Sequence, residues 1–272
     1  MGRLISVIMP VYNAERFVAD AIRSVVNQTH EEWELLIVND GSSDRSEHII
    51  QSFQDNRIHY FFQQNRGVSA ARNVALRHAK GDFFCFLDAD DVYTANALSA
   101  RLPIFDTDSA VAFVDGAVEV FDHTMQHILR TWKPSFRGNA FSSLTTLSDS
   151  CFFGNTWMIK NIPGVTYQFA EDLAHAEDLF FYITIAHQGM YSFTPATILH
   201  YRKNEGSAMS NLDGLARGYT ALRQRINLLP GPQLSFIDQV VLQLKTRKIM
   251  FLSFLDSGKI LKAFRYAITG SI

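Results

Sequence analysis

The first hundred residues alternate between short apolar runs and segments with helical spacing, and this alternation constrains the fold more than any other feature. Four short apolar runs of strand length span 4–9, 34–38, 58–62 and 83–87, and the first has the pattern of a strand buried on both faces. Between them, apolar residues recur at helical spacing, with Asn13 and Asp44 as candidate helix caps. This order predicts an α/β fold with a doubly wound, mostly parallel sheet flanked by helices.

The middle of the chain is harder to interpret. Residues 110–121 and 191–200 have the alternation of strands, and 177–187 has helical spacing. Residues 136–155 are rich in Ser, Thr and Gly, which predicts an irregular segment. A second, less regular half therefore follows the first hundred residues.

We expect one α/β domain over 1–210, divided into halves at residue 100, and a helical extension over 211–272. The extension is interrupted by the breaker Pro230-Gly231-Pro232. The remaining residues have the composition of a helical tail.

Composition and charge exclude several classes of protein. The formal net charge of −2 gives no overall positive field for nucleic acid. Cys85 and Cys151 have no CxxC neighbour, so we expect no disulfide framework, and a reducing cytoplasm fits. The N-terminal apolar run is too short for a signal peptide, and no stretch reaches the roughly 18 apolar residues that span a bilayer.

Polar clusters follow three of the predicted strands. Tyr12-Asn13 follows the first, Asp40-Gly41 the second and 88–91 the fourth. Because parallel sheets bind ligands beyond the carboxyl ends of their strands, three clusters at one edge predict a binding site. The alternative is that Asn, Asp and Gly merely form turns there.

The acidic run Asp88-Ala89-Asp90-Asp91 predicts a metal site. Carboxylate oxygens suit a hard divalent cation such as Mn²⁺ or Mg²⁺. Such an ion bridges the phosphates of a nucleoside diphosphate and neutralises the charge of the leaving group. An isolated Asp-x-Asp is a weak signal, but this one follows the fully apolar run 83–87 at the expected sheet edge.

Four ordered motifs resemble glycosyltransferase family 2, whose members have the GT-A fold. The resemblance is dense over 4–100 and thin to about 207. The motifs are Pro10-Val11-Tyr12-Asn13, Val38-Asn39-Asp40-Gly41-Ser42-Ser43-Asp44, Asn65-Arg66-Gly67-Val68-Ser69-Ala70-Ala71-Arg72-Asn73 and Phe86-Leu87-Asp88-Ala89-Asp90-Asp91. The resemblance implies transfer of a sugar from a nucleotide-sugar, with 1–100 binding the nucleotide and 101–210 binding the acceptor.

The resemblance also implies a role for matching residues. Tyr12 would pack near the base, and Asp40 would accept a hydrogen bond from it, often from the N–H of uracil. Arg72 and Asp88 would lie near the donor, and Asp90 would contact the metal with Asp88 beside it. The expected nucleotide-sugar site comprises Pro10, Tyr12, Asn13, Asp40, Gly41, Arg72, Asp88, Ala89 and Arg202.

An inverting transferase also needs a base to deprotonate the acceptor hydroxyl. The family places it in a Glu-Asp pair that opens a helix, and two pairs compete here, Glu171-Asp172 and Glu177-Asp178. The second precedes an apolar helix and then Gly189, as the family pattern does. We therefore expect Asp178 as the base with Glu177 beside it, although acids also favour helix N-termini for purely electrostatic reasons.

The segment 200–207 departs from the family pattern. Asn204 occupies the place where relatives carry a His that can touch the metal or diphosphate. His200 is an alternative ligand, although a lone His at a strand end is more often structural. Arg202 and Lys203 are candidates to meet the diphosphate when a loop closes.

The tail is basic and amphipathic. Six Lys or Arg and two acids lie in 234–272, among many large apolar residues. This pattern predicts a helix pair that lies on an anionic membrane, or one that packs on the domain or on another subunit. Membrane contact would suit a lipid-linked acceptor.

The sequence therefore predicts inverting transfer from a nucleotide-sugar, UDP-sugars first, to a saccharide or lipid-linked acceptor. One alternative is a sugar-phosphate nucleotidyltransferase, which should carry a Gly-rich basic loop after the first strand where this chain has Tyr12-Asn13-Ala14-Glu15. The other is a non-catalytic nucleotide-sugar-binding protein. A homo-oligomer is compatible with all three.

Overall fold

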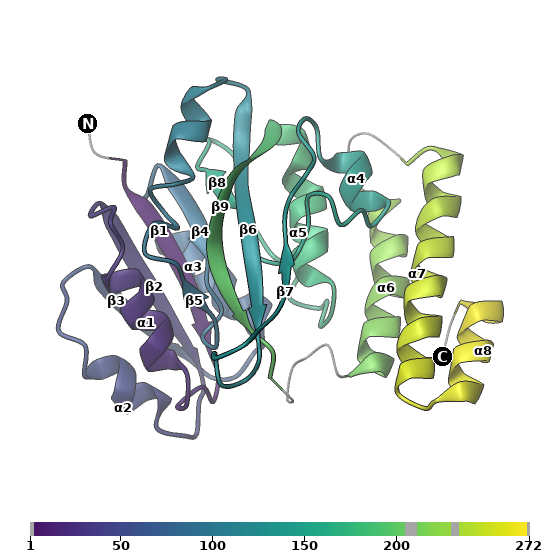
Figure 1. The fold of residues 1–272 in the computed structure, drawn as a ribbon, viewed down its shortest axis with the longest axis horizontal. Helices are drawn as coiled ribbons and strands as arrows, with labels where there is room; N and C mark the ends of the chain where they lie inside the picture. Colours follow the sequence, from purple (N-terminus) through teal and green to yellow (C-terminus); the bar gives the residue numbers. More distant parts are fainter. Residues whose placement is uncertain (1–2, 205–210, 230–233, 271–272) are drawn as a thin grey trace.

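One mixed sheet forms the centre of the molecule (Figure 1). The computed structural model describes residues 3–204, 211–229 and 234–270. Within these residues the strands follow the order β3-β2-β1-β4-β8-β6-β9-β5, with β7 paired to β6. The strands are β1 Ile5–Val11, β2 Trp33–Asp40, β3 Ile58–Gln63, β4 Phe83–Phe86, β5 Val92–Tyr93, β6 Val111–Phe121, β7 Ile128–Trp132, β8 Met158–Lys160 and β9 Met190–Arg202.

The first half of the sheet is parallel, as predicted. β1 pairs in parallel with β2 and with β4, and β2 pairs in parallel with β3. β1, β2 and β4 are buried along their whole length, which explains their continuous apolar runs. The second half mixes directions, because β8 is antiparallel to β4 and β6 whereas β9 is parallel to β6.

Helices cover both faces of the sheet, and one buried apolar cluster lies on each face. Ile5, Val7 and Met9 of β1 pack with α1 on one face, whereas Ile8 packs with α3 and α5 on the other. The helices are α1 Val18–Val26, α2 Ser46–Gln51, α3 Val68–His78, α4 Phe141–Thr145, α5 Glu177–Ile185, α6 Leu212–Ile226, α7 Phe236–Asp256 and α8 Ile260–Thr269, with 3-10 turns η1 Leu102–Asp106 and η2 Ala186–Gln188.

One predicted helix start is wrong. α1 begins at Val18, five residues after Asn13, and no side chain caps it. Asn13 instead adopts a positive φ of 48°, and its side-chain oxygen accepts a hydrogen bond from the Ser43 N–H at 2.8 Å. The Asn13 side chain therefore joins the loop after β1 to the loop after β2. Asp44 accepts from the Ser46 N–H at 2.9 Å and so does support the start of α2.

The C-terminal extension consists of α6, α7 and α8, which lie side by side at the end of the molecule away from β3 (Figure 1). Leu222, Ile226, Leu234 and Leu242 are buried in the same apolar cluster as α3 and α5. The extension therefore shares a core with the domain, and an independent unit boundary at 210 stays a prediction. None of the described helices is both long and apolar enough to cross a bilayer.

Candidate active site

A cavity of about 910 Å³ opens where the strand order reverses. β2 and β3 lie on one side of β1, and β4 lies on the other, so the carboxyl ends of β1 and β4 form the switch point of the sheet. Open α/β sheets bind ligands at such points, because the loops after the two strands diverge and leave a crevice. The volume suits a nucleotide-sized ligand.

Eight of the predicted residues line this cavity, together with Ala14, Arg16, Phe17, Val68, His123, Tyr201 and Asn204. The eight are Pro10, Tyr12, Asn13, Arg72, Asp88, Ala89, Asp90 and Glu177. Three sequence-distant segments, the loop after β1, the acidic turn after β4 and the start of α5, thus meet at one place.

Arg72 of α3 joins the acidic turn to α5. Its Nη2 donates to Asp88 Oδ1 at 2.8 Å, and its Nη1 donates to Glu177 Oε1 at 3.2 Å. Its side chain is only 3% exposed. Burial alone would lower the pKa of Arg72, but the charges of Asp88 and Glu177 outweigh it and raise that pKa. Arg72 is therefore charged at every physiological pH, and it fixes the distance between the two acidic segments.

The acidic turn is held from behind by the end of β9. The Arg202 backbone N–H donates to Asp91 Oδ1 at 2.9 Å, and the Arg202 Nε donates to the Asp90 carbonyl at 2.9 Å. The Asn204 amide donates to Asp90 Oδ2 at 2.8 Å. Burial, followed by repulsion from Asp88, raises the pKa of Asp90. The turn thus concentrates negative charge that a bound cation would stabilise.

The residues present fit a divalent cation that a ligand helps to hold. No set of three His, Cys, Asp or Glu side chains in the described ranges surrounds a common metal position. Asp88 and Asp90 both line the cavity, and Mg²⁺-type ions are commonly held by one or two carboxylates together with substrate phosphates and water. The buried Arg72 Nε also has no hydrogen-bond partner among the described residues. Both observations suit a site that a phosphate ligand completes.

Asp40 and Gly41 do not line the cavity, and Asp40 instead holds the loop before α3. Its carboxylate accepts from the Gln63 side chain at 2.6 Å and from the N–H groups of Arg66 and Gly67 at 2.8 and 2.9 Å. Gly41 has a φ of 74°, and a Cβ there would lie 2.8 Å from the Asn65 nitrogen. The Asp40-Gly41 pair therefore positions the segment that leads to Arg72, and a contact of Asp40 with the base stays a prediction.

The predicted base lies in the first turn of α5. Asp178 is partly buried, and its Oδ1 accepts from the Leu179 N–H at 2.7 Å. Burial and, next, the charge of Glu177 raise the pKa of Asp178 to about 7. A carboxylate poised near neutrality has the pKa that suits a general base.

Residues 6–162 match the family model described as Glycosyl transferase family 2. This chain belongs to glycosyl transferase family 2. The match covers more than half of the chain and includes the loop after β1, α3 and the acidic turn.

Relatives and solved structures agree with this assignment. The UDP-Glc:alpha-D-GlcNAc-diphosphoundecaprenol beta-1,3-glucosyltransferase WfgD of Escherichia coli is 38% identical over 121 residues, which are 44% of this chain and 47% of WfgD. This chain spans between about a fifth and a half of the length of the curated relatives that it matches.

Two solved structures confirm the predicted GT-A fold. S. aureus TarS 1–349 in complex with UDP-GlcNAc has a TM-score of 0.67 at 17% identity, covering 98% of this chain and 81% of that one. The mannosyltransferase PcManGT from Pyrobaculum calidifontis, in complex with GDP-Man and Mn2+, has a TM-score of 0.63 at 18% identity, covering 98% and 76%.

The competing acidic pair of this family 2 chain lies elsewhere. Asp172 is exposed and paired with Arg225 on α6, which lowers the pKa of Asp172. Glu171 pairs with Arg66 at 2.8 Å and accepts from Asn73 at 3.1 Å. This pair thus ties α3 and α6 to the segment before α5, and it does not line the cavity.

Two further predicted residues support the site from outside the cavity. The Arg202 guanidinium is buried against the Phe17 ring at 4.8 Å and donates to the His123 carbonyl at 3.2 Å. His200 Nε2 lies 3.3 Å from Glu119 Oε2, and His200 does not line the cavity. Arg202 therefore shapes the cavity wall in this structure, and its contact with a diphosphate stays a prediction.

The seven cavity residues outside the predicted site include four with large side chains near the acidic turn or the first motif: Arg16, Phe17, His123 and Tyr201. Arg16 and Phe17 closely follow the first motif, so a wider motif window would have included them. His123 lies in the turn between β6 and β7, where no periodicity or motif marks it. Tyr201 lies between the two positions that were considered, His200 and Arg202.

α6 supports the loop that carries the predicted base. His175 packs into a notch formed by Gly214 and Gly218, where added Cβ atoms would lie 2.2 and 2.7 Å from it. Ala176 has a φ of 60°, a strained conformation for a residue with a side chain. The notch holds this strained turn in place directly before Glu177 and Asp178.

Proposed function

We propose that this chain is an inverting transferase that moves a sugar from a UDP-sugar to a hydroxyl group, with Asp178 as the base. The observation that carries the proposal is the pair of ion pairs through which Arg72 binds Asp88 and Glu177. They join a turn suited to a metal-bound diphosphate to the helix that carries Asp178. The deprotonated hydroxyl attacks the anomeric carbon of the donor sugar, and the bond between that carbon and the diphosphate breaks in the same displacement.

The exposed aromatic ring of Tyr12 lines the cavity and supplies a surface for stacking. We propose that Asp40, at the end of the neighbouring strand β2, accepts a hydrogen bond from a base N–H. WfgD is named as a UDP-Glc enzyme and TarS was solved with UDP-GlcNAc, whereas PcManGT was solved with GDP-Man. We expect a UDP-sugar to be hydrolysed fastest in a panel of nucleotide-sugars. Preference for a GDP-sugar, or turnover only of a nucleoside triphosphate with a sugar phosphate, would contradict the proposal.

The acceptor is proposed to be a saccharide or a lipid-linked glycan of surface polysaccharide synthesis. WfgD acts on a GlcNAc-diphosphoundecaprenol by its name. Glu177 lines the cavity directly before Asp178, and we expect it to bind an acceptor hydroxyl. Transfer to a GlcNAc-diphosphate lipid and to the free sugar should be compared.

Turnover is proposed to depend on Mn²⁺ or Mg²⁺, held by Asp90 and Asp88. The cavity is lined by three carboxylates, those of Asp88, Asp90 and Glu177, against the cations of Arg16 and Arg72. Because Arg72 is already paired with two of these carboxylates, a diphosphate would be repelled without a further cation. When bound, the metal would neutralise the leaving diphosphate.

EDTA is therefore expected to abolish donor hydrolysis, and added Mn²⁺ to restore it. Asp90→Asn should raise the Mn²⁺ concentration for half-maximal activity at least about tenfold, since even outer partners of metal sites contribute about 10–100-fold. Asp149→Asn, an exposed acid outside the cavity, is the matched control. Full turnover in EDTA would rule out the metal.

The pH dependence follows from the raised pKa of Asp178. The base acts only when ionised, and a raised pKa means that it is still protonated at mildly acidic pH. We expect log kcat/KM to fall with unit slope below an inflection near the value of about 7. A profile that stays flat down to pH 5 would contradict the assignment of Asp178.

A further inference from the structure

α8 presents a row of large apolar side chains to solvent. Ile260, Leu261, Phe264 and Ile268 occupy one face at helical spacing, and Leu261 is 88% exposed. The opposite face, with Ala263 and Tyr266, is buried against α6 and α7. Single exposed apolar residues are ordinary, but four that share one helix face form a contiguous apolar patch, which is typical of an interaction surface.

α7 carries a second exposed row in its first half. Phe236, Ile237, Val240 and Leu244 repeat the same spacing, and Phe236 is 80% exposed. Two helical turns beyond Leu244, Phe251 lies on the same face, and there it packs edge-to-face on Phe264 of α8 at 5.5 Å. α8 therefore covers only the second half of this face of α7.

The charge of this region is opposite to that of the rest of the chain. Six of the 25 Lys and Arg, and two of the 27 Asp and Glu, lie after residue 233. This segment thus carries +4, and the first 233 residues carry −6. On α8 itself, Lys262 and Arg265 flank the exposed apolar row, and Lys259 precedes it. Basic residues beside an apolar helix face are typical of helices that lie in the surface of an anionic bilayer.

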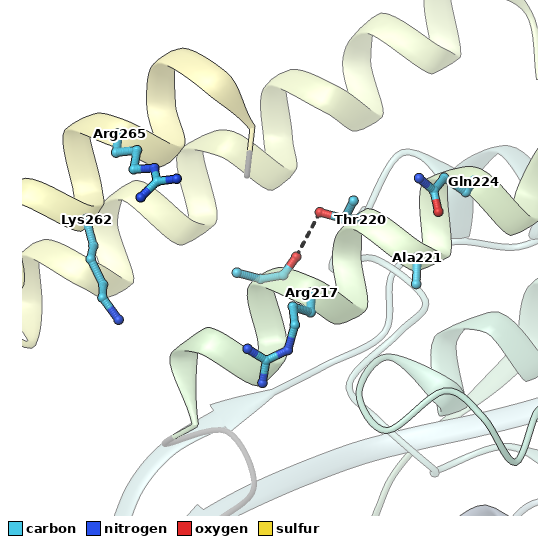
Figure 2. A pocket seen from close by; sticks show the side chains of 7 residues that line it. Arg217, Thr220, Ala221, Gln224, Lys262 and Arg265 are labelled. Atoms are coloured by element: carbon cyan, nitrogen blue, oxygen red, sulfur yellow. Dashed lines mark hydrogen bonds between the residues drawn. The ribbon is translucent and has the colours of Figure 1, made fainter. Parts of the chain in front are cut away.

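A basic groove of about 610 Å³ lies between α6 and α8 (Figure 2). Figure 2 shows the cationic side chains of Arg217, Lys262 and Arg265 extending from the facing helices around it. Ala216 and Ala221 leave the space open, and Lys262 is tied to Asp213 at 2.6 Å, which fixes α8 on α6. Paired cations with donor groups suit a phosphate.

We propose that α8 is an interfacial anchor that binds an anionic phospholipid surface. The row of Ile260, Leu261, Phe264 and Ile268 enters the acyl boundary, and a lipid headgroup phosphate binds in the groove at Arg217 and Arg265. The charge of +4 selects this occupant over a second copy of the chain, because two such surfaces would repel each other. The proposal does not depend on the sugar that the site transfers.

The experiment is co-sedimentation of the full chain with two kinds of vesicle. One contains phosphatidylcholine alone, and the other contains phosphatidylcholine with about 30% phosphatidylglycerol. We expect binding to the anionic vesicles that weakens at high salt. Lys259→Glu with Arg265→Glu should weaken it at least about 25-fold, because each basic residue near such a surface contributes to the affinity by about a factor of five. Leu261→Ser with Phe264→Ser should weaken it at least roughly 30-fold.

Matched controls lie on β7, where Ile128 and Leu129 are 54% and 52% exposed, close to the 55% of Phe264, and at the exposed Lys133. Ile128→Ser with Leu129→Ser, and Lys133→Glu, should leave vesicle binding unchanged. Lys262 is kept, since its ion pair holds α8, and thermal unfolding should show that every variant is folded. Absence of vesicle binding, equal losses in the controls, or a dimer that Leu261→Ser with Phe264→Ser dissociates would each overturn the proposal.

Discussion

Asp178→Asn is expected to lower kcat by about 10²–10⁴-fold, the usual contribution of a positioned general base. Asn has nearly the same shape, and it keeps an oxygen that accepts from the Leu179 N–H, so α5 should still form. It cannot accept the proton of the attacking hydroxyl. Turnover should be measured with the donor that the panel identifies. Donor affinity by calorimetry should change little, because Asp178 is proposed to act on the acceptor hydroxyl, and Glu177 and not Asp178 lines the donor cavity.

Asp172→Asn is the matched control, because Asp172 is the aspartate of the other Glu-Asp pair, Glu171-Asp172, in this part of the chain. Asp172 is exposed and paired with Arg225, so its substitution should leave kcat within about threefold of the original and cost little stability. If Asp178→Asn retained most of its turnover, or if Asp172→Asn lost as much, Asp178 would not be the base.

Arg72→Met is expected to destabilise the fold by about 3 kcal/mol and to abolish donor binding. Removing one partner of a buried ion pair typically costs about 3–5 kcal/mol, because the other charge stays behind without a partner. Here two carboxylates, of Asp88 and Glu177, lose their shared cation, and the lower end of the range applies because Asp88 is partly exposed. Urea unfolding at neutral pH measures the loss.

Arg66→Met provides a control from the same motif. Arg66 pairs with Glu171 at 2.8 Å, the same length as the Arg72–Asp88 pair, but the Arg66 side chain is 62% exposed against 3% for Arg72. An exposed pair contributes about 0–1 kcal/mol, so Arg66→Met should change unfolding little. Equal losses for the two variants would show that burial does not set the contribution of Arg72.

The parallel half of the fold could be predicted because three of its four strands are buried along their whole length, whereas β3 is only partly buried, and because its helices bury one face. β1, β2 and β4 therefore read as continuous apolar runs, and α3 has regular spacing. β8 has three residues and pairs with strands that come before and after it in the order of the sheet. So short an element carries no period, and nothing local in the sequence marks it.

Residue types at the site could be predicted, whereas the direction of their side chains could not. Asp40 and Asn13 lie at strand ends on the expected edge of the sheet. Their hydrogen-bond partners, Arg66 and Ser43, are 26 and 30 residues away in the sequence. Such contacts depend on how the loops meet in space. The chemistry of Asn13 suits both a helix cap and a loop contact, so the sequence alone does not distinguish the two roles.

The notch that Gly214 and Gly218 form for His175 has a consequence for the evolution of the chain. Because Gly214 and Gly218 of α6 contact His175, we expect that α6 cannot be exchanged between relatives without the turn that contains His175. A recombination between residues 175 and 214 would pair an incoming α6 with a foreign His175 loop. We expect chimaeras to keep their activity only when α6 and the turn at His175 come from the same parent.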